Sequence, residues 1–198
     1  MSQLLLESIR IDHGKTPLLP YHQARMNASV QALYGVKNTI SLQNTIQRVV
    51  KHHLKGVYKC RIVYERQIKS ITITPYQIKP IKSLKLVDGD GLTYDLKYEN
   101  RQKINQLFEQ RGEFDDILIL KNGYLTDTSY CNVFLFDGHE WWTPNTCLLK
   151  GTRRSFLLKN GQVRERSIHQ KDLHNYKKIR LCNAMIPWAD GVGFDLFF

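Results

Sequence analysis

The sequence lacks any long hydrophobic run. Its longest apolar stretches, such as residues 117–120, are far too short to span a bilayer. Residues 1–7 contain a few leucines but no preceding basic segment and no cleavage-like site, which argues against a secretory signal peptide. These absences predict a soluble, cytoplasmic protein that has no membrane partner.

Cysteine is scarce, and no two cysteines form a C-x-x-C pair. The four cysteines, Cys60, Cys131, Cys147 and Cys182, are irregularly spaced. Such spacing argues against both a disulfide framework and a zinc site. The simplest interpretation is that all four are reduced thiols of a cytosolic protein, and that the chain binds no metal.

Acidic residues are fewer than basic residues. The chain has 18 aspartates and glutamates and 29 lysines and arginines, which gives a formal net charge of +11. A basic chain suggests nucleic acid as a partner, but the basic residues are scattered and no nucleic-acid-binding motif is present, so we expect none. The surplus can instead attract small anions, such as a phosphorylated cofactor and a carboxylate substrate. It can equally be a solvated surface without a specific role.

What is present is enough for a folded core. The 198 residues are 42% hydrophobic, as in globular proteins of one or two lobes. Pro80 interrupts the pattern and marks the expected boundary between two α/β lobes. The smaller, N-terminal lobe is expected to span residues 1–80. The larger, C-terminal lobe is expected to span residues 81–198 and to carry Lys97.

The expected helices and strands are short and mixed in order, without a long β-α-β series, which is typical of an α+β fold. An extended edge is expected at 17–20, before a helix that begins at Tyr21 and stops at Gly35. Ser41 is a good N-cap for a second helix that runs to about Leu54. The other strands are expected at 4–11, 57–64, 70–76, 83–87, 116–121, 124–126, 132–136, 163–167 and 178–182, and the other helices at 100–110, 151–161 and 170–173.

Lys97 is the first residue with candidate chemistry. It lies in the segment 95–101, just ahead of a predicted helix. A lysine that is partly desolvated and near cationic neighbours has a lowered pKa and can bind a carbonyl compound covalently. The alternative is that Lys97 is one of many surface lysines.

Three further features suit an anionic, aromatic ligand. Gly151, followed by Thr152 and Arg153 at a helix start, could bind a phosphate through backbone N–H groups, although an ordinary helix start with a basic first turn has the same sequence. Arg25, on the first helix, could hold a phosphate through two hydrogen bonds or lie on a solvated helix face. Asp127, between two strands, could pair with a protonated ring nitrogen or bond to its own backbone in a turn.

In this order along the chain, these residues resemble the motifs of the class IV aminotransferase family, the fold-type IV pyridoxal-phosphate enzymes. The resemblance implies a two-lobed α+β fold like that of the D-amino acid aminotransferases. The last motif, at 182–187, is similar to that of the family's 4-amino-4-deoxychorismate lyases and differs from the Gly-Thr-Ala sequence usual in branched-chain transaminases. The other matched segments are 6–10, 18–26, 97–101, 125–134 and 151–154.

The resemblance implies a binding site for pyridoxal 5'-phosphate. Lys97 would bind the cofactor covalently and then serve as the general base. Asp127 would keep the ring nitrogen of the cofactor protonated. The cofactor phosphate would be held by Arg25, Gly151, Thr152 and Arg153, with Asn183 and Ala184 as further candidates.

Two residues are expected on the substrate side of this site. Ser8 occupies the position where the lyases have a hydroxyl residue, and it would donate a proton to the departing group. Arg61, on a predicted strand, would bind a substrate carboxylate. Each has an ordinary alternative, which is a strand serine bonded to the backbone and a surface arginine.

The implied activity is that of a lyase of folate biosynthesis, which converts 4-amino-4-deoxychorismate, a small amino-carboxylate, to 4-aminobenzoate and pyruvate. The enzyme is expected to be a homodimer. One alternative is a transaminase of branched-chain or D-amino acids, and another is a non-catalytic member of the family. Two departures from the family pattern favour the non-catalytic alternative. The chain is N-terminally shortened relative to the family, and Asp127 stands where the family usually has glutamate.

Overall fold

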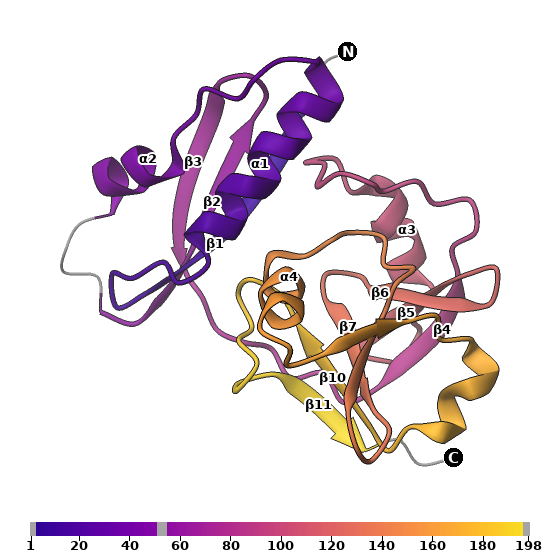
Figure 1. Cartoon of the computed structure of the whole chain (residues 1–198). Helices are drawn as coiled ribbons and strands as arrows, with labels where there is room; N and C mark the ends of the chain where they lie inside the picture. The colour runs from indigo at the N-terminus through magenta and orange to yellow at the C-terminus, as the bar shows by residue number, and fades with distance from the viewer. Residues whose placement is uncertain (1–2, 51–54, 196–198) are drawn as a thin grey trace. The chain divides into compact units, whose positions relative to one another are not determined.

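The chain folds into two compact units, which are drawn in Figure 1. The computed structural model describes residues 3–50 and 55–195. The first unit comprises Met1–Ile78 with Leu96–Asn100, and the second comprises Lys79–Asp95 with Arg101–Phe198. Both units combine helices with a mainly antiparallel sheet, as expected for an α+β fold. No helix within the described residues has the length and apolar character needed to cross a bilayer.

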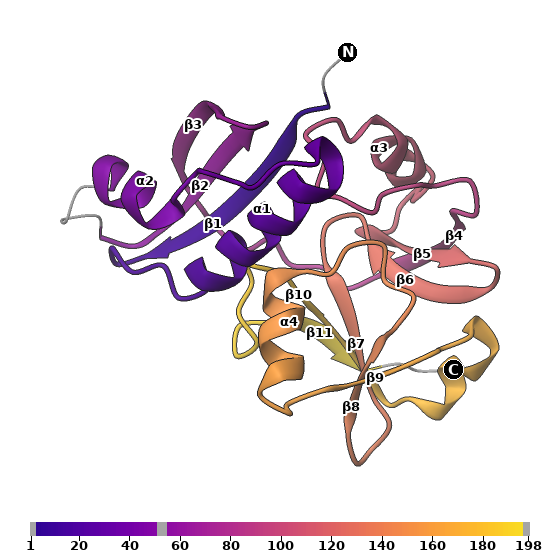
Figure 2. The same ribbon diagram turned by 45° about the horizontal axis from the view of Figure 1, so that its top comes forward.

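The first unit is a three-stranded antiparallel sheet with one face covered by a helix. The strands β1 (Leu5–Asp12), β2 (Val57–Tyr64) and β3 (Ile68–Pro75) lie in that order. Figure 2 shows helix α1 (Leu19–Tyr34) lying along β1. The core beneath α1 is apolar, because alternate side chains of each strand point to the same face. It contains Leu5, Ile9, Ile11, Met26, Val30, Cys60 and Ile62.

The two helices of the first unit have recognisable ends. Helix α1 starts at Leu19 with Pro20 in its first turn, and residues 17–18 form a turn, so the expectation of an extended segment at 17–20 was wrong. Gly35 stops the helix in the left-handed conformation, with φ of 67°. Helix α2 (Leu42–Val49) is capped by Ser41, whose Oγ accepts a hydrogen bond from the backbone N–H of Asn44 at 3.2 Å. The expected end of α2 near residue 54 lies outside the described residues, and the helix ends at Val49.

Residues 96–100 belong to the first unit, although they follow a strand of the second. The backbone N–H of Leu6 donates to the carbonyl of Lys97 at 2.9 Å, and the N–H of Glu99 donates to the carbonyl of Leu4 at 2.8 Å. The segment therefore pairs with the free edge of β1. Lys97 was expected in the C-terminal lobe, and this expectation is corrected. The expectation had assumed that the chain passes from one lobe to the other only once.

The second unit is built on an eight-stranded mixed sheet. Strands run in the order β11-β10-β7-β6-β5-β4, while β8 pairs with β7 and β9 pairs with β8. Sequence patterns missed β8 and β11, which are short and lie beside aromatic or glycine-rich segments. The elements are β4 (Leu84–Asp88), α3 (Gln102–Glu109), β5 (Asp116–Lys121), β6 (Tyr124–Thr128), β7 (Asn132–Phe136), β8 (Trp141–Pro144), α4 (Thr152–Lys159), β9 (Arg164–Arg166), a 3-10 helix (Gln170–Asn175), β10 (Lys178–Cys182) and β11 (Val192–Asp195).

The hairpin between β5 and β6 places the predicted acidic residue on a buried strand. Asn122 and Gly123 both have positive φ, at 50° and 76°, as the expected two-residue turn requires. The strand that follows is buried from Leu125 onward and includes Asp127. A polar side chain in this apolar layer needs partners, and these are supplied by the neighbouring strand β7 and by the segment that precedes α4.

Candidate active site

A charged cluster lies buried in the first unit, between β1 and α1. Glu7 is completely buried, and its Oε1 accepts a hydrogen bond from Arg25 Nε at 2.9 Å. Its Oε2 accepts from Arg25 Nη2 at 2.5 Å and from His22 Nδ1 at 2.6 Å. His22 and Arg25 are three residues apart on α1, so both reach the same strand. These hydrogen bonds and the ion pair link the helix to the sheet within an otherwise apolar interface.

The electrostatics of this cluster favour an ionised Glu7 beside a neutral His22. Burial alone would raise the pKa of Glu7, but the Arg25 charge and the hydrogen bonds from His22 and Arg25 lower it to about 2. Burial lowers the pKa of His22, although the bond to Glu7 opposes this shift. The Nε2 atom of His22 is buried and has no hydrogen-bond partner in the part of the chain that the structure describes.

Ser8 and Arg61 share the other face of the same sheet. They are directly opposed in the register of β1 and β2, so their side chains point to the same side. Arg61 Nη2 forms an ion pair with Glu99 Oε1 at 2.6 Å. Glu99 lies two residues after Lys97 on the segment that pairs with β1. Three predicted residues, Ser8, Arg61 and Lys97, therefore come from adjacent segments of one sheet, and Arg61 has a carboxylate partner that was not expected.

In the second unit, the carboxylate of Asp127 is buried and held by two donors. Its Oδ1 accepts from Asn132 Nδ2 at 2.7 Å, and its Oδ2 accepts from the backbone N–H of Leu149 at 3.0 Å. Burial raises the pKa of Asp127 to about 6, although these bonds and the nearby Arg154 charge oppose the rise. A cationic partner would favour the ionised form of such a carboxylate.

The start of α4 has the features of a phosphate site. Gly151 is the N-cap residue of the helix. Because glycine has no side chain, it cannot accept a hydrogen bond from the first backbone N–H groups of the helix. The Oγ1 atom of Thr152 is buried and has no hydrogen-bond partner among the described residues. A Cβ on Gly151 would lie 2.0 Å from Oδ1 of Asn132, so the helix start packs directly on the residue that holds Asp127. An unpartnered hydroxyl and a helix N-terminus of eight residues fit a bound phosphate group.

The other predicted phosphate residues have mixed surroundings. Arg153 is buried in the first turn of α4, and its guanidinium lies 5.8 Å from the centre of the Phe156 ring. Asn183 uses its Oδ1 to accept from the backbone N–H groups of Met185 and Ile186, at 2.7 and 2.9 Å. Its side chain therefore shapes the turn after β10, where Ala184 is partly exposed. A ligand contact at this turn would come from the backbone.

Sequence reasoning missed four residues that belong to these clusters, which are Glu7, His22, Glu99 and Asn132. All four lie in the matched segments, but none was assigned a role. A signal was available for the first cluster, because Glu7 interrupts the apolar series of Leu5, Ile9 and Ile11 on one face of β1. A charge at a core position indicates a buried partner.

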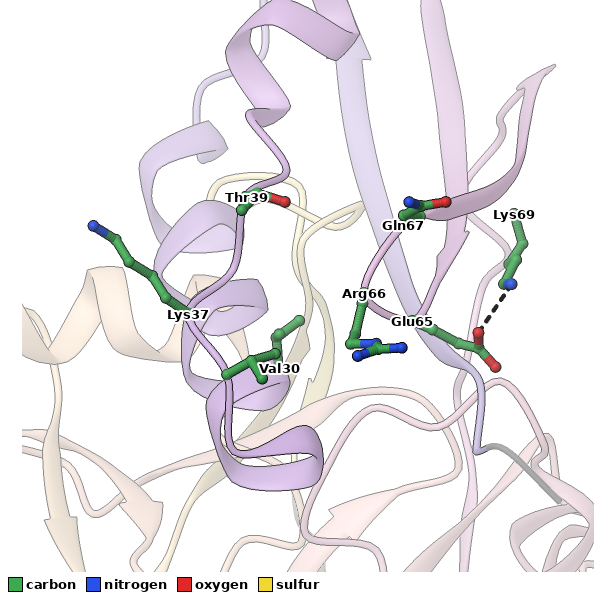
Figure 3. Close-up of a pocket in the computed structure, with 8 residues that line it drawn as sticks. Val30, Lys37, Thr39, Glu65, Arg66, Gln67 and Lys69 are labelled. Carbon is green, nitrogen blue, oxygen red and sulfur yellow. Dashed lines mark ion pairs between the residues drawn. The ribbon is translucent and has the colours of Figure 1, made fainter.

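One pocket of the first unit contains none of the predicted site residues. It has a volume of about 450 Å³ and is shown in Figure 3. Glu65 and Lys69, at its edge, form an ion pair of 2.9 Å. The other lining residues are Val30, Val36, Lys37, Thr39, Arg66 and Gln67. The predicted chemistry of the first unit lies elsewhere, on β1, β2 and the segment that contains Lys97.

The chain is similar to known proteins along nearly its whole length. A protein of Haemophilus influenzae without a described function is 38% identical over 183 residues, which are 91% of this chain and 97% of that protein. A protein of Schizosaccharomyces pombe, described as a candidate aminodeoxychorismate lyase, is 27% identical over 203 residues, 90% of this chain and 85% of that protein.

A solved structure and a family model agree with these relatives. The crystal structure of a candidate 4-amino-4-deoxychorismate lyase from Haemophilus somnus matches with a TM-score of 0.87 and 33% identity, over 94% of this chain and 98% of that chain. The model of the family "Amino-transferase class IV" matches residues 4–191. The chain belongs to the class IV aminotransferase family, whose enzymes depend on pyridoxal phosphate and have the fold described above.

Proposed function

We propose that this enzyme is a 4-amino-4-deoxychorismate lyase, which releases 4-aminobenzoate and pyruvate. The observation that carries the proposal is the match, at 33% identity and over 98% of its length, to the candidate lyase of Haemophilus somnus. The motif at 182–187, which is similar to that of the lyases, supports the same assignment.

We assign the cofactor contacts to the residues that the family resemblance names. Lys97 would bind pyridoxal phosphate covalently, and Asp127 would pair with its ring nitrogen. Thr152, with the backbone at Gly151 and Arg153, would bind the phosphate, which the unpartnered Oγ1 of Thr152 supports. Arg25 would contribute the remaining charge to the phosphate, and the turn at Asn183 and Ala184 would contribute backbone groups.

When bound, the cofactor supplies an electron sink, and the side chains move the protons. The amine of Lys97 would remove the proton from the carbon that bears the substrate's amino group. The bond between the ring carbon and the enolpyruvyl oxygen would then break. Ser8 would donate a proton to the methylene carbon of the departing group, which leaves as pyruvate, and the ring becomes aromatic. Arg61 would release the carboxylate of Glu99 and bind a substrate carboxylate in its place.

Reduction with borohydride tests the role of Lys97. The wild-type protein, incubated with pyridoxal phosphate and dialysed, should be yellow, and borohydride should attach the cofactor permanently to a peptide containing Lys97. Lys97→Ala should give neither the visible band nor the adduct, whereas Lys103→Ala, on the exposed surface of α3, should give both. A colourless wild-type protein would contradict the assignment and favour a non-catalytic family member.

The role of Ser8 is tested by an activity assay. With 4-amino-4-deoxychorismate as substrate, Ser8→Ala should slow the formation of 4-aminobenzoate by about a hundredfold, because a positioned proton donor contributes on that order. The visible band of the bound cofactor should be unchanged, since Ser8 is not assigned to the cofactor. Turnover that requires 2-oxoglutarate instead would identify a transaminase.

We also propose that the enzyme is a cytoplasmic homodimer, as the family resemblance implies. Sedimentation equilibrium should then give a mass twice that of the 23.2-kDa chain. A mass equal to that of one chain would contradict the proposal.

A further inference from the structure

The carboxylate of Glu7 is committed to two side chains of α1. It accepts three hydrogen bonds, two from Arg25 and one from His22, and it is fully buried. The two bonds to Nε and Nη2 form the bidentate arrangement that fixes a guanidinium in one plane. His22, itself 1% exposed, donates to the same Oε2 that accepts from Arg25 Nη2.

The fold alone gives no reason for a charge at this position. The neighbours of Glu7 on the same face of β1, Leu5, Ile9 and Ile11, are apolar and completely or almost completely buried. An apolar residue at position 7 would complete this face, and apolar side chains of similar volume commonly replace a buried ion pair without loss of stability. A retained charge at such a site therefore suggests a function beyond packing.

The ion pair determines where the guanidinium of Arg25 can lie. An arginine side chain loses rotamer entropy when it is fixed. Because Glu7 fixes Arg25 before any ligand arrives, a phosphate that meets this guanidinium has a smaller ordering cost. Glu7 also neutralises the formal charge of Arg25, so orientation rather than net charge would determine the affinity of this contact.

We propose that Glu7 is a positioning residue, which holds the guanidinium of Arg25 in the orientation that binds the cofactor phosphate, and that His22 holds Glu7. The inference rests on the proposed function, which assigns Arg25 to that phosphate. It adds two residues, Glu7 and His22, that would affect cofactor affinity without touching the cofactor.

A comparison of two ligands tests the proposal. Pyridoxal phosphate and pyridoxal can both react with a lysine, but only the first carries a phosphate. Glu7→Asp keeps the charge and removes one methylene, so the shortened carboxylate cannot span His22 and Arg25. We expect Glu7→Asp to weaken the binding of pyridoxal phosphate by about tenfold, the effect of re-ordering one long side chain, and to change pyridoxal binding less than twofold.

One control variant and two variants of His22 accompany Glu7→Asp. Glu65→Asp removes the same methylene from the ion pair with Lys69, visible in Figure 3, and should change the binding of neither ligand. His22→Asn keeps a donor for Glu7 and should therefore bind pyridoxal phosphate more tightly than His22→Leu does. His22→Leu removes the donor, should weaken pyridoxal-phosphate binding alone, and provides the same comparison if Glu7→Asp does not fold.

The outcomes separate this inference from the proposed function. Equal losses for both ligands, or no loss for either, would overturn the positioning role while leaving the cofactor assignment intact. A wild-type chain that binds neither ligand at Lys97 would refute the proposed function and the inference together. Only a loss confined to the phosphorylated ligand supports a positioning residue, since a general loss of structure would affect both.

Discussion

At the scale of single residues, Glu7 and Asp127 are both buried carboxylates but differ in their protonation behaviour. Glu7 has a guanidinium beside it, and its pKa is lowered to about 2. Asp127 accepts bonds from an amide and a backbone N–H, and burial raises its pKa to about 6. A full opposite charge outweighs burial, whereas neutral donors do not. A protonated ring nitrogen beside Asp127 would provide the charge that this carboxylate lacks.

The raised pKa of Asp127 predicts how stability depends on pH in the absence of cofactor. The folded state retains a proton up to about pH 6, whereas the unfolded chain releases it near 3.8, so the folded state loses stability as pH rises between these values. As pH rises from about 3.8 to about 6, we expect the melting temperature of the wild type to fall relative to that of Asp127→Asn. Above about pH 6, the difference between the two melting temperatures should stay constant.

Asp115→Asn is the control for that titration. Asp115 is exposed, and its pKa is lowered by bonds from the backbone N–H groups of Lys82 and Ser83. Its contribution therefore changes only below its ordinary value of 3.8. Thermal melts from pH 4 to 8 should show a constant difference between Asp115→Asn and the wild type. A constant difference for Asp127→Asn as well would show that the folded state holds no proton on Asp127 between about pH 4 and pH 6.

At the scale of helices and strands, the contact between β7 and the glycine that precedes α4 is the closest packing in the candidate site. Gly151 has φ of −63° and ψ of 148°, which any residue can adopt, so its need for glycine is purely steric. A Cβ there would meet Oδ1 of Asn132 at 2.0 Å. Asn132 cannot move without releasing Asp127 and the carbonyl of Leu149, to which it also donates at 2.9 Å.

Gly151→Ala should therefore destabilise the second unit and weaken cofactor binding together. We expect a loss of about 1–3 kcal/mol in the free energy of unfolding, typical of an overpacked site. Gly91→Ala is the matched control, because a Cβ at Gly91 meets nothing within 4 Å. Urea denaturation of both variants, with and without pyridoxal phosphate, measures the two effects. Equal stability of the two variants would show that the helix start can shift away from Asn132.

Local patterns predicted most of the strands and helices and failed where tertiary contacts decide. Alternation located β1, β2 and β3, and the glycine after Tyr34 located the end of α1. The four-residue strand β8 is too short for a pattern to be visible. The segment that contains Lys97 was placed in the wrong lobe because its hydrogen bonds go to residues more than 90 positions earlier, and no local signal records that pairing.

The candidate site was predicted through resemblance more than through periodicity. The motifs named Lys97, Asp127 and Gly151, but the partners of those residues depend on packing. That Glu7 binds Arg25, and that Asn132 holds Asp127, follows only from the register of strands and from the helix on the sheet. Elements set by a local rule were predictable, and pairings between distant elements were not.

At the scale of the whole molecule, cofactor binding should be visible as thermal stabilisation. A ligand that binds only the folded state at a hundred times its Kd adds about 2.7 kcal/mol to the free energy of unfolding. For a chain of this size, this corresponds to roughly 5–10 °C in melting temperature. The rise should appear with pyridoxal phosphate in the wild type and be largely lost in Lys97→Ala. An identical rise in both proteins would place the binding away from Lys97.

The first unit is discontinuous in sequence, and this has a consequence for its synthesis. The edge of β1 is paired by residues 97–99, so a ribosome must translate a strand of the second unit before the first can be completed. Until then, the emerging chain exposes the backbone donors and acceptors of β1, which is the kind of edge that pairs with other chains. Domains commonly fold in the order in which they emerge, at about 5–20 residues per second. Here the order is interrupted, and the edge of the nascent N-terminal sheet would stay unpaired for about 1–5 seconds while the chain from β3 to the segment that carries Lys97 is made.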